Sequence, residues 1–325
     1  MPRTFLRTVG RFAVSTLVLC SACAFGFSQD SAAASAIKHD PWNPALIGIR
    51  SEHTYEDIRG ARETLYVFEP VRSVHRPAPL VVYIHGGFLL HGDAVIGYDP
   101  LSYNPHDRMI SSVEAGLVAH GFVFATINYR LAPRYRWPVQ LEDAKAAIRY
   151  LRAHAQQFGI NPRRVGVMGD SAGGGLSNFV GLTGRLRGYN DGAWAHWSSA
   201  VQAVVDMFGP TDRAPFARRW LRAHPDEPNP VFGLYTPRTI ARESAVTYVR
   251  PGDPPFLIIQ GLDDKTEPPF QSIDLYDHLR SVGDRVHLIL VRHMAHEFHA
   301  VGAPISPGIP ALAHDVVAFF ERTLR

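Results

Sequence analysis

Hydrophobic residues along the chain follow two different spacings. Short, continuous apolar runs recur at intervals, and such runs are typical of strands buried on both faces of a parallel sheet. The runs predict strands at residues 65–68, 80–84, 122–127, 164–169, 201–208, 255–260 and 286–291. Apolar positions with helical spacing predict helices at residues 108–119, 143–158 and 311–322, and a further helix that opens at Ser171. Strands that alternate with helices predict an α/β fold, with a mostly parallel central sheet and helices on both faces.

One long segment interrupts this alternation. Residues 211–253 are rich in proline, arginine and aromatic residues and show no clear strand or helix spacing. Long insertions in compact folds are often lids or binding loops. We therefore expect a single catalytic domain over residues 37–325, in which residues 211–253 form a small lid-like insertion that serves as a cap or pocket wall. The alternative is a surface excursion without a role.

The first residues differ in composition from the rest. Three arginines within residues 1–11 precede an apolar run over residues 12–27 and a stretch of small residues. This order is typical of a secretory signal peptide, so we expect residues 1–36 to direct export to the periplasm or the medium. The run is shorter than the roughly 20 apolar residues of a membrane span, and we expect no integral span in the mature protein. The alternatives are an uncleaved anchor and, because Ser-Ala precedes Cys23, a lipoprotein signal.

The charge and cysteine content exclude several other classes. The net charge is +3, and lysine and arginine are spread along the chain, so no nucleic-acid-binding surface is predicted. Both cysteines, Cys20 and Cys23, lie in the predicted signal peptide. A mature protein without them has neither a disulfide framework nor a cysteine metal site. The expected partner is a small molecule, and the sequence leaves the oligomeric state open.

Residues 169–173 carry the strongest chemical signal. Gly169-Asp170-Ser171-Ala172-Gly173 matches the pattern G-x-S-x-G at a point where a predicted strand runs directly into a predicted helix. This is the setting of a nucleophile elbow, in which a strained turn presents a serine above the sheet edge. Ser171 is therefore the candidate nucleophile. The alternative is an ordinary glycine-rich turn between a strand and a helix.

His85-Gly86-Gly87 follows the strand predicted at residues 80–84. Acyl transfer places negative charge on the carbonyl oxygen, and preorganised backbone N–H groups stabilise that charge. Glycines let the backbone approach the substrate closely. Gly86 and Gly87, together with the amide of Ala172, are therefore the candidate oxyanion hole, with a simple glycine turn as the alternative.

A serine nucleophile needs a base, and the base needs an acid that orients it. In elbow-type hydrolases the chain order is serine, acid, histidine, with both partners on loops after late strands. The candidates for the acid, after the strand at residues 255–260, are Asp263, Asp264 and Glu267. The candidates for the base, after the last strand, are His293, His296 and His299. Order and position support a triad without choosing among these residues. The histidines lack zinc-type spacing, so no metal site is predicted.

At these motifs the chain resembles the α/β-hydrolase superfamily, and within it the hormone-sensitive-lipase-like and bacterial feruloyl-esterase-like carboxylesterases. The resemblance is carried by residues 83–87, 128–133 and 169–174, together with Pro138 and Asp143. It implies the α/β-hydrolase fold and ester cleavage through an acyl-enzyme on the serine. It implies neither a metal nor an organic cofactor.

The resemblance also chooses among the candidate residues. The family has a His-Gly-x-x-Asp pattern after this strand, and here Gln260 stands in place of that histidine. Counting on from Gln260 puts the family acid at Asp264, with Asp263 as its rival. The segment Ala-His-Glu-Phe at residues 295–298 is similar to the context of the family histidine, which favours His296.

Several neighbouring residues have expected structural effects. Phe88 stands where the family has a third glycine and is expected to reshape the acyl side of the site. Residues 89–107 form a longer segment than the family shows and are expected to line the pocket. Arg130 and Asp143 resemble residues that brace the structure, and Asp170 is expected to be a structural hydrogen-bonding residue.

Together these observations predict a serine hydrolase that cleaves carboxylic esters, with short acyl chains preferred, through an acyl-enzyme on Ser171. Two alternatives remain open. The same fold and residues also serve amidases, formamidases and peptidases. The more distant alternative is a non-catalytic binding protein with a hydrolase fold, which a missing triad member would favour.

Overall fold

The computed structural model describes residues 48–58, 61–70, 77–95, 104–186 and 188–325. The predicted signal peptide over residues 1–36 lies outside these ranges and stays a prediction. Among the helices in the described ranges, none has the length and apolar character needed to cross a membrane.

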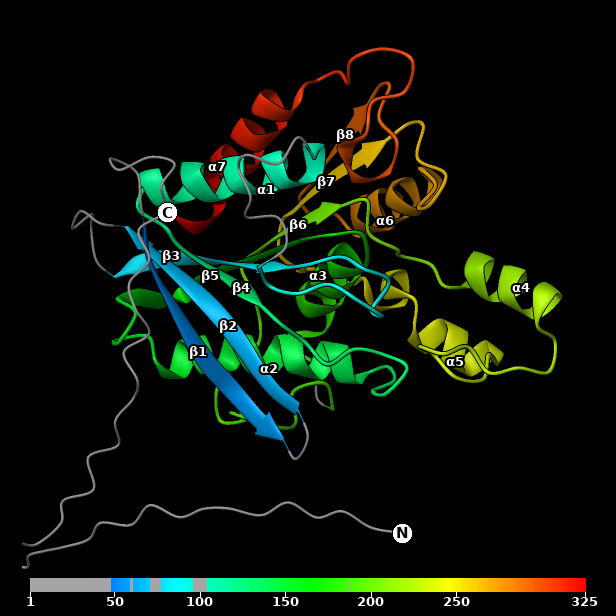
Figure 1. Cartoon of the computed structure of the whole chain (residues 1–325), viewed down its shortest axis with the longest axis horizontal. Coiled ribbons are helices and arrows are strands. Elements are labelled where there is room, and N and C mark those ends of the chain that lie inside the picture. The colour runs from blue at the N-terminus through cyan, green and yellow to red at the C-terminus, as the bar shows by residue number, and fades with distance from the viewer. Residues whose placement is uncertain (1–47, 59–60, 71–76, 96–103, 187) are drawn as a thin grey trace, which may run out of the picture. The chain divides into compact units, whose positions relative to one another are not determined.

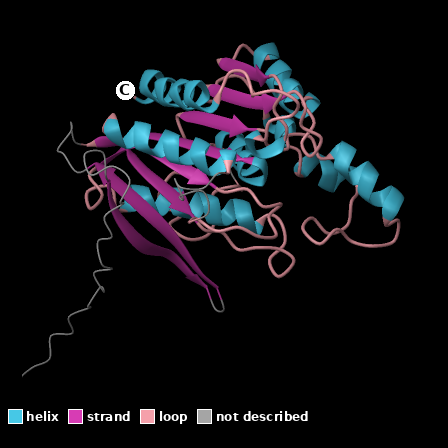
Figure 2. Ribbon diagram, turned by 45° about the horizontal axis from the view of Figure 1, so that its top comes forward, coloured by secondary structure: helices cyan, strands magenta, loops and turns pink. Residues whose placement is uncertain are grey.

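A single sheet forms the centre of the described structure, with the order β1-β2-β4-β3-β5-β6-β7-β8 (Figures 1 and 2). β2 is antiparallel to both of its neighbours, β1 and β4, and every other neighbouring pair is parallel. The bounds are β1 Gly48–Ile58, β2 Ala61–Pro70, β3 Ala78–Ile84, β4 Val123–Ile127, β5 Ile160–Asp170, β6 Ala203–Met207, β7 Phe256–Gly261 and β8 Val286–Val291.

Helices cover both faces of this sheet, as Figure 1 shows. α1 and α7 pack side by side on one face, and α2, α3 and α6 contribute buried residues to the other. The bounds are α1 Pro105–Ala119, α2 Val139–Ala153, α3 Ser171–Thr183, α4 Ala214–Ala223, α5 Pro237–Arg242, α6 Phe270–Ser281 and α7 Ile309–Leu324. Two short 3-10 helices are η1, Ala245–Tyr248, and η2, His296–Phe298.

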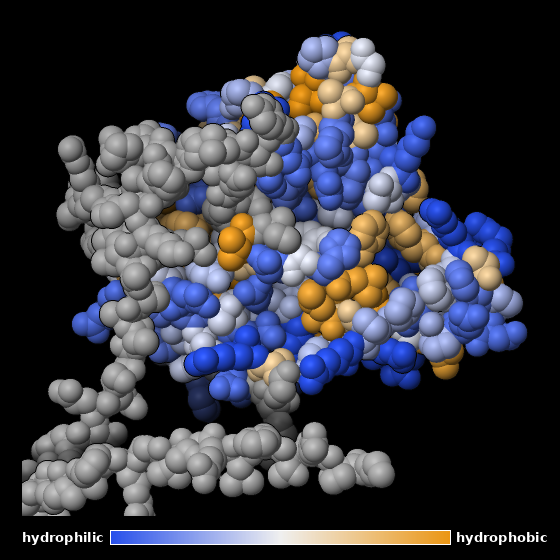
Figure 3. All heavy atoms as spheres, viewed as in Figure 1, coloured by the Kyte–Doolittle hydropathy of each residue, from blue (hydrophilic) through white to orange (hydrophobic). Residues whose placement is uncertain are grey.

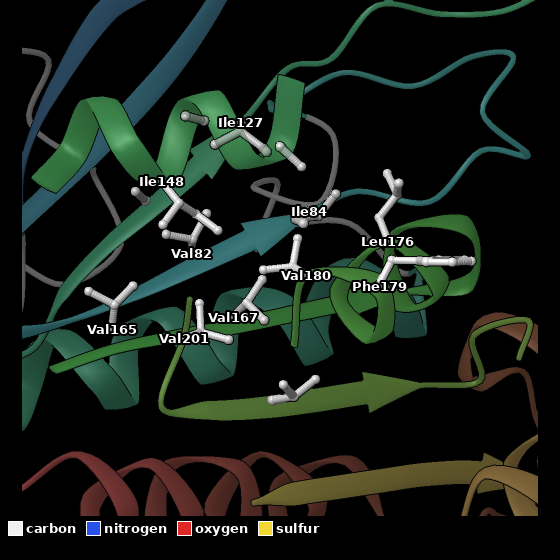
Figure 4. Close-up of a cluster of buried hydrophobic side chains, with 14 of the residues drawn as sticks. Val82, Ile84, Ile127, Ile148, Val165, Val167, Leu176, Phe179, Val180 and Val201 are labelled. Carbon is white, nitrogen blue, oxygen red and sulfur yellow. The ribbon is translucent and has the colours of Figure 1, made fainter. Parts of the chain in front are cut away.

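The sheet interior explains the continuous apolar runs. Every residue of β3, β4, β6 and β7 is buried, because helices cover both faces of these strands. Figure 4 shows one of the two apolar layers, where Ile148 of α2 and Val180 of α3 lie among Val82, Ile84 and Val167 of the sheet. Burying an aliphatic side chain of this size contributes roughly 1.5–3 kcal/mol. The layers therefore hold the strand ends in fixed positions.

The predicted α/β architecture is confirmed, and several elements were not predicted. β1 is an edge strand with the polar sequence Gly-Ile-Arg-Ser-Glu-His-Thr-Tyr-Glu-Asp-Ile, which lacks an apolar run. α4, α5 and η1 lie within residues 211–253, where proline and arginine masked the helical spacing. α6 was also not predicted. β5 begins at Ile160, four residues before the strand predicted at residues 164–169.

The topology brings the candidate residues to one edge of the sheet. β3, β5, β7 and β8 run parallel, so the segments that follow them all emerge at the same edge. In open α/β sheets this carboxyl-terminal edge is where ligands bind.

Candidate active site

Ser171 occupies a strained turn between β5 and α3. Its φ is +48°, a left-handed value that a non-glycine residue rarely adopts. A Cβ on Gly169 would lie 2.3 Å from the carbonyl oxygen of Gly173, and one on Gly173 would lie 2.0 Å from the carbonyl oxygen of Ile84. Both glycines are therefore required by close backbone approach, which accounts for their spacing around the serine.

His296 bridges Ser171 and Asp264. Its Nε2 lies 3.0 Å from Oγ of Ser171, and its Nδ1 lies 2.7 Å from Oδ2 of Asp264. The other carboxylate oxygen, Oδ1, accepts hydrogen bonds from the backbone amides of Thr266 and Glu267, each at 2.9 Å. Asp264 is thus fixed by its own loop, and the imidazole ring is fixed by Asp264.

The rival residues lie elsewhere. Asp263 is exposed, and its backbone amide donates to the carbonyl of Met294. His293 is exposed, and the side chain of His299 is 56% exposed. Of the three acids and three histidines raised by the sequence, the structure brings only Asp264 and His296 into a hydrogen-bonded row with Ser171.

Gly86 directly adjoins the candidate nucleophile. A Cβ on Gly86 would lie 3.3 Å from Cβ of Ser171. In the described part of the chain, the amides of Gly86 and Gly87 have no backbone or side-chain acceptor. The amide of Ala172 lies in the first turn of α3, where helical N–H groups have no partner within the helix. All three amides are thus available to an oxyanion.

The segment that carries these glycines is held by aromatic and imidazole groups. The Tyr129 hydroxyl donates to the carbonyls of His85 and Gly86, at 2.9 Å and 3.1 Å. The His85 ring stacks on Tyr129 at 4.3 Å, and its Nδ1 lies 2.7 Å from the carbonyl oxygen of Gly86. Gly87 adopts a φ of +104°, and a Cβ there would lie 2.1 Å from the carbonyl oxygen of His91. The turn is therefore rigid before any substrate binds.

Asp170 connects the elbow to the rear of the site. It accepts a 2.6 Å hydrogen bond from the Tyr83 hydroxyl, and its Oδ2 lies 3.2 Å from Nε2 of His106 in α1. Burial alone would lower the pKa of His106, but Asp170 and Asp107 raise it to about 10. Burial alone would raise the pKa of Asp170, yet His106 and Tyr83 lower it below its usual value. The structural role expected for Asp170 agrees with these contacts. No local motif marks His106, and Tyr83 was noted for the strand and motif around it, without its contact to Asp170.

Gln260 holds the loop that carries the acid. Its Nε2 donates to the carbonyls of Gly261 and Glu267, both at 3.0 Å, and its Oε1 accepts from Oγ of Ser272 at 2.8 Å. The residue noted in the sequence as a departure from the family pattern therefore closes the loop that positions Asp264.

A cavity of about 720 Å³ opens beside Ser171. Its apolar wall is mainly aromatic and includes Trp137, Phe179, Phe216, Trp220 and Phe232. Residues of α4 and of the segment between α4 and α5 line it, so part of the segment 211–253 contributes to its wall. Figure 3 shows hydrophobic surface gathered between the body of the sheet and the α4–α5 region.

The segment after Gly86 and Gly87 also lines this cavity. Phe88, Leu89 and Leu90 belong to its wall, and Phe88 is 55% exposed. Residues 96–103 of the expected pocket segment lie outside the described ranges. Four arginine, lysine or glutamate residues line the same cavity: Arg213, Arg219, Lys265 and Glu267. The sequence raised Glu267 only as a rival acid and gave no signal for Arg213.

Two further expectations from the sequence concern the Arg130–Asp143 pair and metal binding. Arg130 forms an ion pair with Asp143, whose Oδ2 also accepts from the backbone amide of Arg130 at 2.8 Å, so this pair braces the segment before α2. Within the described ranges, no cluster of three or more histidine, cysteine or acidic side chains is arranged to hold a metal ion.

The chain is similar to one protein family and to several known proteins. Residues 65–279 match the BD-FAE family. Esterase LipC of Mycobacterium tuberculosis (strain ATCC 25618 / H37Rv) is 32% identical over 264 residues, which are 77% of this chain and 60% of LipC. Arylacetamide deacetylase of Oryctolagus cuniculus is 40% identical over 117 residues, 35% of this chain and 27% of that protein. The chain thus spans less than two thirds of the length of these relatives.

A solved structure supports the fold assignment. The truncated form of a carbohydrate esterase from gut microbiota superimposes with a TM-score of 0.66 at 24% identity, covering 86% of this chain and 98% of that one. This likeness confirms the α/β-hydrolase fold that the sequence resemblance implied. Because the family match covers residues 65–279, the chain belongs to the BD-FAE family of α/β-hydrolases.

Proposed function

We propose that this chain is a carboxylesterase-type serine hydrolase that forms an acyl-enzyme on Ser171. The observation that carries the proposal is the hydrogen-bonded triad from Asp264 through His296 to Ser171, next to the amides of Gly86 and Gly87, which have no acceptor among the described residues. The names of relatives, Esterase LipC among them, favour ester chemistry. A candidate for each of nucleophile, base and acid, in hydrogen-bond contact, weighs against a non-catalytic binding protein.

In the proposed mechanism, Nε2 of His296 removes the proton from Ser171 as Oγ attacks the ester carbonyl carbon. The carbonyl oxygen becomes an oxyanion and accepts hydrogen bonds from the amides of Gly86, Gly87 and Ala172. Asp264 keeps the proton on Nδ1 of His296 and stabilises the imidazolium.

His296 then returns a proton to the departing alcohol, and the acyl group remains on Ser171. Water, deprotonated by His296, attacks the acyl-enzyme and releases the acid. Each of these steps uses groups that belong to the chain, the ester and water.

The proposal includes a preference for short acyl chains. Phe88 directly follows the oxyanion glycines and lines the cavity, where its ring takes space from an acyl group. Aromatic residues of the segment 211–253, among them Phe216, Trp220 and Phe232, form another part of the cavity wall. We therefore propose that this segment acts as a cap that selects the substrate.

Initial rates on p-nitrophenyl esters from acetate to laurate test the proposal, with Ser171→Ala as the control. We expect turnover to be highest for the short esters and to be lost in the variant, because no other group replaces the serine oxygen. Wild-type activity in Ser171→Ala would contradict the assignment of the nucleophile. A flat or rising profile with acyl length would contradict the short-chain preference.

A second candidate function is amide cleavage. The similarity to arylacetamide deacetylase over 117 residues favours it, since that relative is named for an arylamide substrate. The same row of residues serves both reactions, and only the leaving group differs. Comparing p-nitrophenyl acetate with p-nitroacetanilide under identical conditions distinguishes them: faster turnover of the anilide would favour amide hydrolysis.

We also propose that the chain is exported by a signal peptide within residues 1–36, on the evidence of its basic start and short apolar run. Mass spectrometry of the protein recovered from periplasm and medium tests this. A mature N-terminus near residue 36 supports export, and a diacylglyceryl group on Cys23 would support the lipid-anchored alternative. Recovery of the intact chain from the cytoplasm would contradict the proposal.

A further inference from the structure

Four arginine, lysine or glutamate residues, Arg213, Arg219, Lys265 and Glu267, line the cavity beside Ser171, and two of them have buried polar atoms without a partner among the described residues. Arg213 lies between β6 and α4, and Glu267 lies in the loop after β7. Nε of Arg213 and Oε2 of Glu267 are buried, and neither atom has a hydrogen-bond partner among the described residues. Buried polar atoms in folded proteins nearly always have partners. Both residues line one cavity, and their unpaired atoms therefore indicate where a polar group of a ligand binds.

Glu267 is held in a fixed position relative to the triad. Its residue is only 6% exposed. Its backbone amide donates to Oδ1 of Asp264 at 2.9 Å, and its backbone carbonyl accepts from Nε2 of Gln260 at 3.0 Å. The carboxylate that orients His296 thus also fixes the backbone of Glu267, so the side chain is preorganised with respect to the reacting atoms.

Arg213 is held by aromatic rings and by the start of the cap. Its Cζ lies 4.0 Å from the ring centroid of Phe232 and 5.5 Å from that of Phe216. Its backbone amide donates to Oγ of Ser244 at 2.9 Å. A guanidinium stacked on a ring keeps its N–H groups at the edge, where they remain able to donate.

The charges around Glu267 determine which protonation state faces the cavity. Burial raises the pKa of Glu267 to about 8, with Arg213 opposing the rise and the nearby Asp264 and Asp206 adding to it. At neutral pH the carboxyl group is therefore mostly protonated. A protonated carboxyl group both donates and accepts hydrogen bonds, whereas Arg213 only donates.

We propose that Glu267 and Arg213 form a specificity pair that binds a hydroxyl group on the ester substrate. The inference rests on the proposed esterase function and names the class of ester, one with a hydroxyl-bearing arm. A hydroxyl group accepts from Arg213 and exchanges a hydrogen bond with Glu267, so both unpaired atoms gain a partner. Arg213, Arg219 and Lys265 all line this cavity and disfavour a cationic arm.

Matched esters test this pair directly. Cyclohexyl acetate and 4-hydroxycyclohexyl acetate differ only by a hydroxyl group on the alcohol side, and methyl cyclohexanecarboxylate and its 4-hydroxy derivative differ in the same way on the acyl side. The rate of acid release gives kcat/KM for each ester. The measured quantity is the ratio of kcat/KM for the hydroxylated ester to that for its partner, which is independent of the fraction of folded enzyme.

Four enzymes are compared at neutral pH: wild type, Glu267→Leu, Glu267→Gln and Glu243→Leu. Glu243 is the matched control because it is 2% exposed, also has unpaired carboxylate oxygens in the described part of the chain, and interacts electrostatically with Arg213. It does not line the cavity. Hydrolysis of p-nitrophenyl acetate by each enzyme serves as the reference reaction.

We expect wild type to favour the hydroxylated ester of at least one pair about tenfold, since a site built to hydrogen-bond a hydroxyl group discriminates against its absence. Glu267→Leu should lower that ratio to near one, while Glu267→Gln, which can still donate and accept, and Glu243→Leu should keep it within about threefold of wild type.

A wild-type ratio near one for both pairs would overturn the inference, and so would an equal loss in Glu267→Leu and Glu243→Leu. If wild type cleaves p-nitrophenyl acetate but shows no hydroxyl preference, the inference alone fails. If wild type does not cleave p-nitrophenyl acetate at all, the proposed function itself fails.

Discussion

Nε2 of His106 lies 3.2 Å from Oδ2 of Asp170, the residue that immediately precedes Ser171. This contact joins the start of α1 to the elbow from behind. Since the pKa of His106 is raised to about 10 and that of Asp170 is lowered, the two side chains form a charged pair near neutral pH. The elbow therefore rests on an interaction that alkaline pH removes.

Replacing His106 with glutamine should change how stability depends on pH. The pKa of His106 in the folded chain exceeds the ordinary value of 6.5, so its contribution is complete below about pH 6.5 and is lost as pH rises toward about 10. Asp107 and Glu297 also favour the protonated ring. We expect wild type to lose more unfolding free energy than His106→Gln across this range, as measured by urea unfolding.

The control for this experiment is His314→Gln, at an exposed position of α7. This variant should follow the wild-type curve. Parallel curves for wild type and His106→Gln would show that the pair is not charged in the folded protein and would contradict the interpretation.

Asparagine at position 264 should nearly abolish turnover, and asparagine at position 263 should not. Asp264→Asn retains the shape of the side chain but removes the charge that stabilises the imidazolium and selects its tautomer, which costs about four orders of magnitude in kcat in comparable triads. Asp263 is exposed and does not contact His296, so its variant should stay within about twofold of wild type. Steady-state kinetics on p-nitrophenyl acetate compare the two, and a greater loss in Asp263→Asn would reverse the assignment.

The sequence predicted the parts of the fold that depend on local pattern. Strands buried on both faces need continuous apolar residues, and β3, β4 and β7 have them. β1 was missed because an edge strand is not required to be apolar. The helix α4 was missed because its arginines and proline are typical of irregular segments. Only Ala217 of this helix is buried, so the helix has little apolar face to reveal its spacing.

In the candidate site, too, the residues marked by a local motif were predicted and those that act through distant contacts were not. Ser171 and the adjacent glycines follow from a motif in which sterics dictate residue type at each position. The choice of Asp264 over Asp263 needed either the family resemblance or the coordinates, because consecutive residues on a loop differ only in orientation. His106 and Arg213 act across long sequence separations, and no local pattern records such contacts.

Alanine at Gly173 should prevent the elbow from forming. Its Cβ would lie 2.0 Å from the carbonyl oxygen of Ile84 and 2.5 Å from that of His85, and backbone atoms on both sides leave no room to adjust. We expect destabilisation of roughly 3 kcal/mol or more, together with loss of turnover. Thermal unfolding and p-nitrophenyl acetate hydrolysis measure both effects.

Gly308→Ala is the matched control, because its Cβ would meet only atoms at 3.9 Å or beyond. Gly308 caps α7, so a loss of about 1 kcal/mol is expected there, without a change in kcat. If Gly173→Ala retained both stability and activity, the close packing of the elbow would not be a requirement.

Leucine at Gln260 should loosen the loop that carries the acid. The substitution keeps the size of the side chain but removes donors to the carbonyls of Gly261 and Glu267 and leaves Ser272 without its acceptor. Unsatisfied buried groups cost about 1–3 kcal/mol each, and three groups lose their partner, so urea unfolding should show a loss of about 3 kcal/mol or more. We also expect kcat to fall more than KM rises, because His296 depends on the position of Asp264. An unchanged kcat in a folded variant would show that the loop holds its shape without Gln260.

Residues 211–253 contribute to the cavity wall, but both ends of this segment are joined to the fold beside the sheet. β6 and β7, which flank this segment, are neighbours in the sheet, with Val204 paired to Phe256. At the start of the segment, Gln271 of α6 binds the backbone of Thr211 and Asp212. Both ends of the segment are thus held next to the sheet. A change in the length or composition of this segment is therefore expected to alter the cavity wall while leaving Ser171, Asp264 and His296 in place.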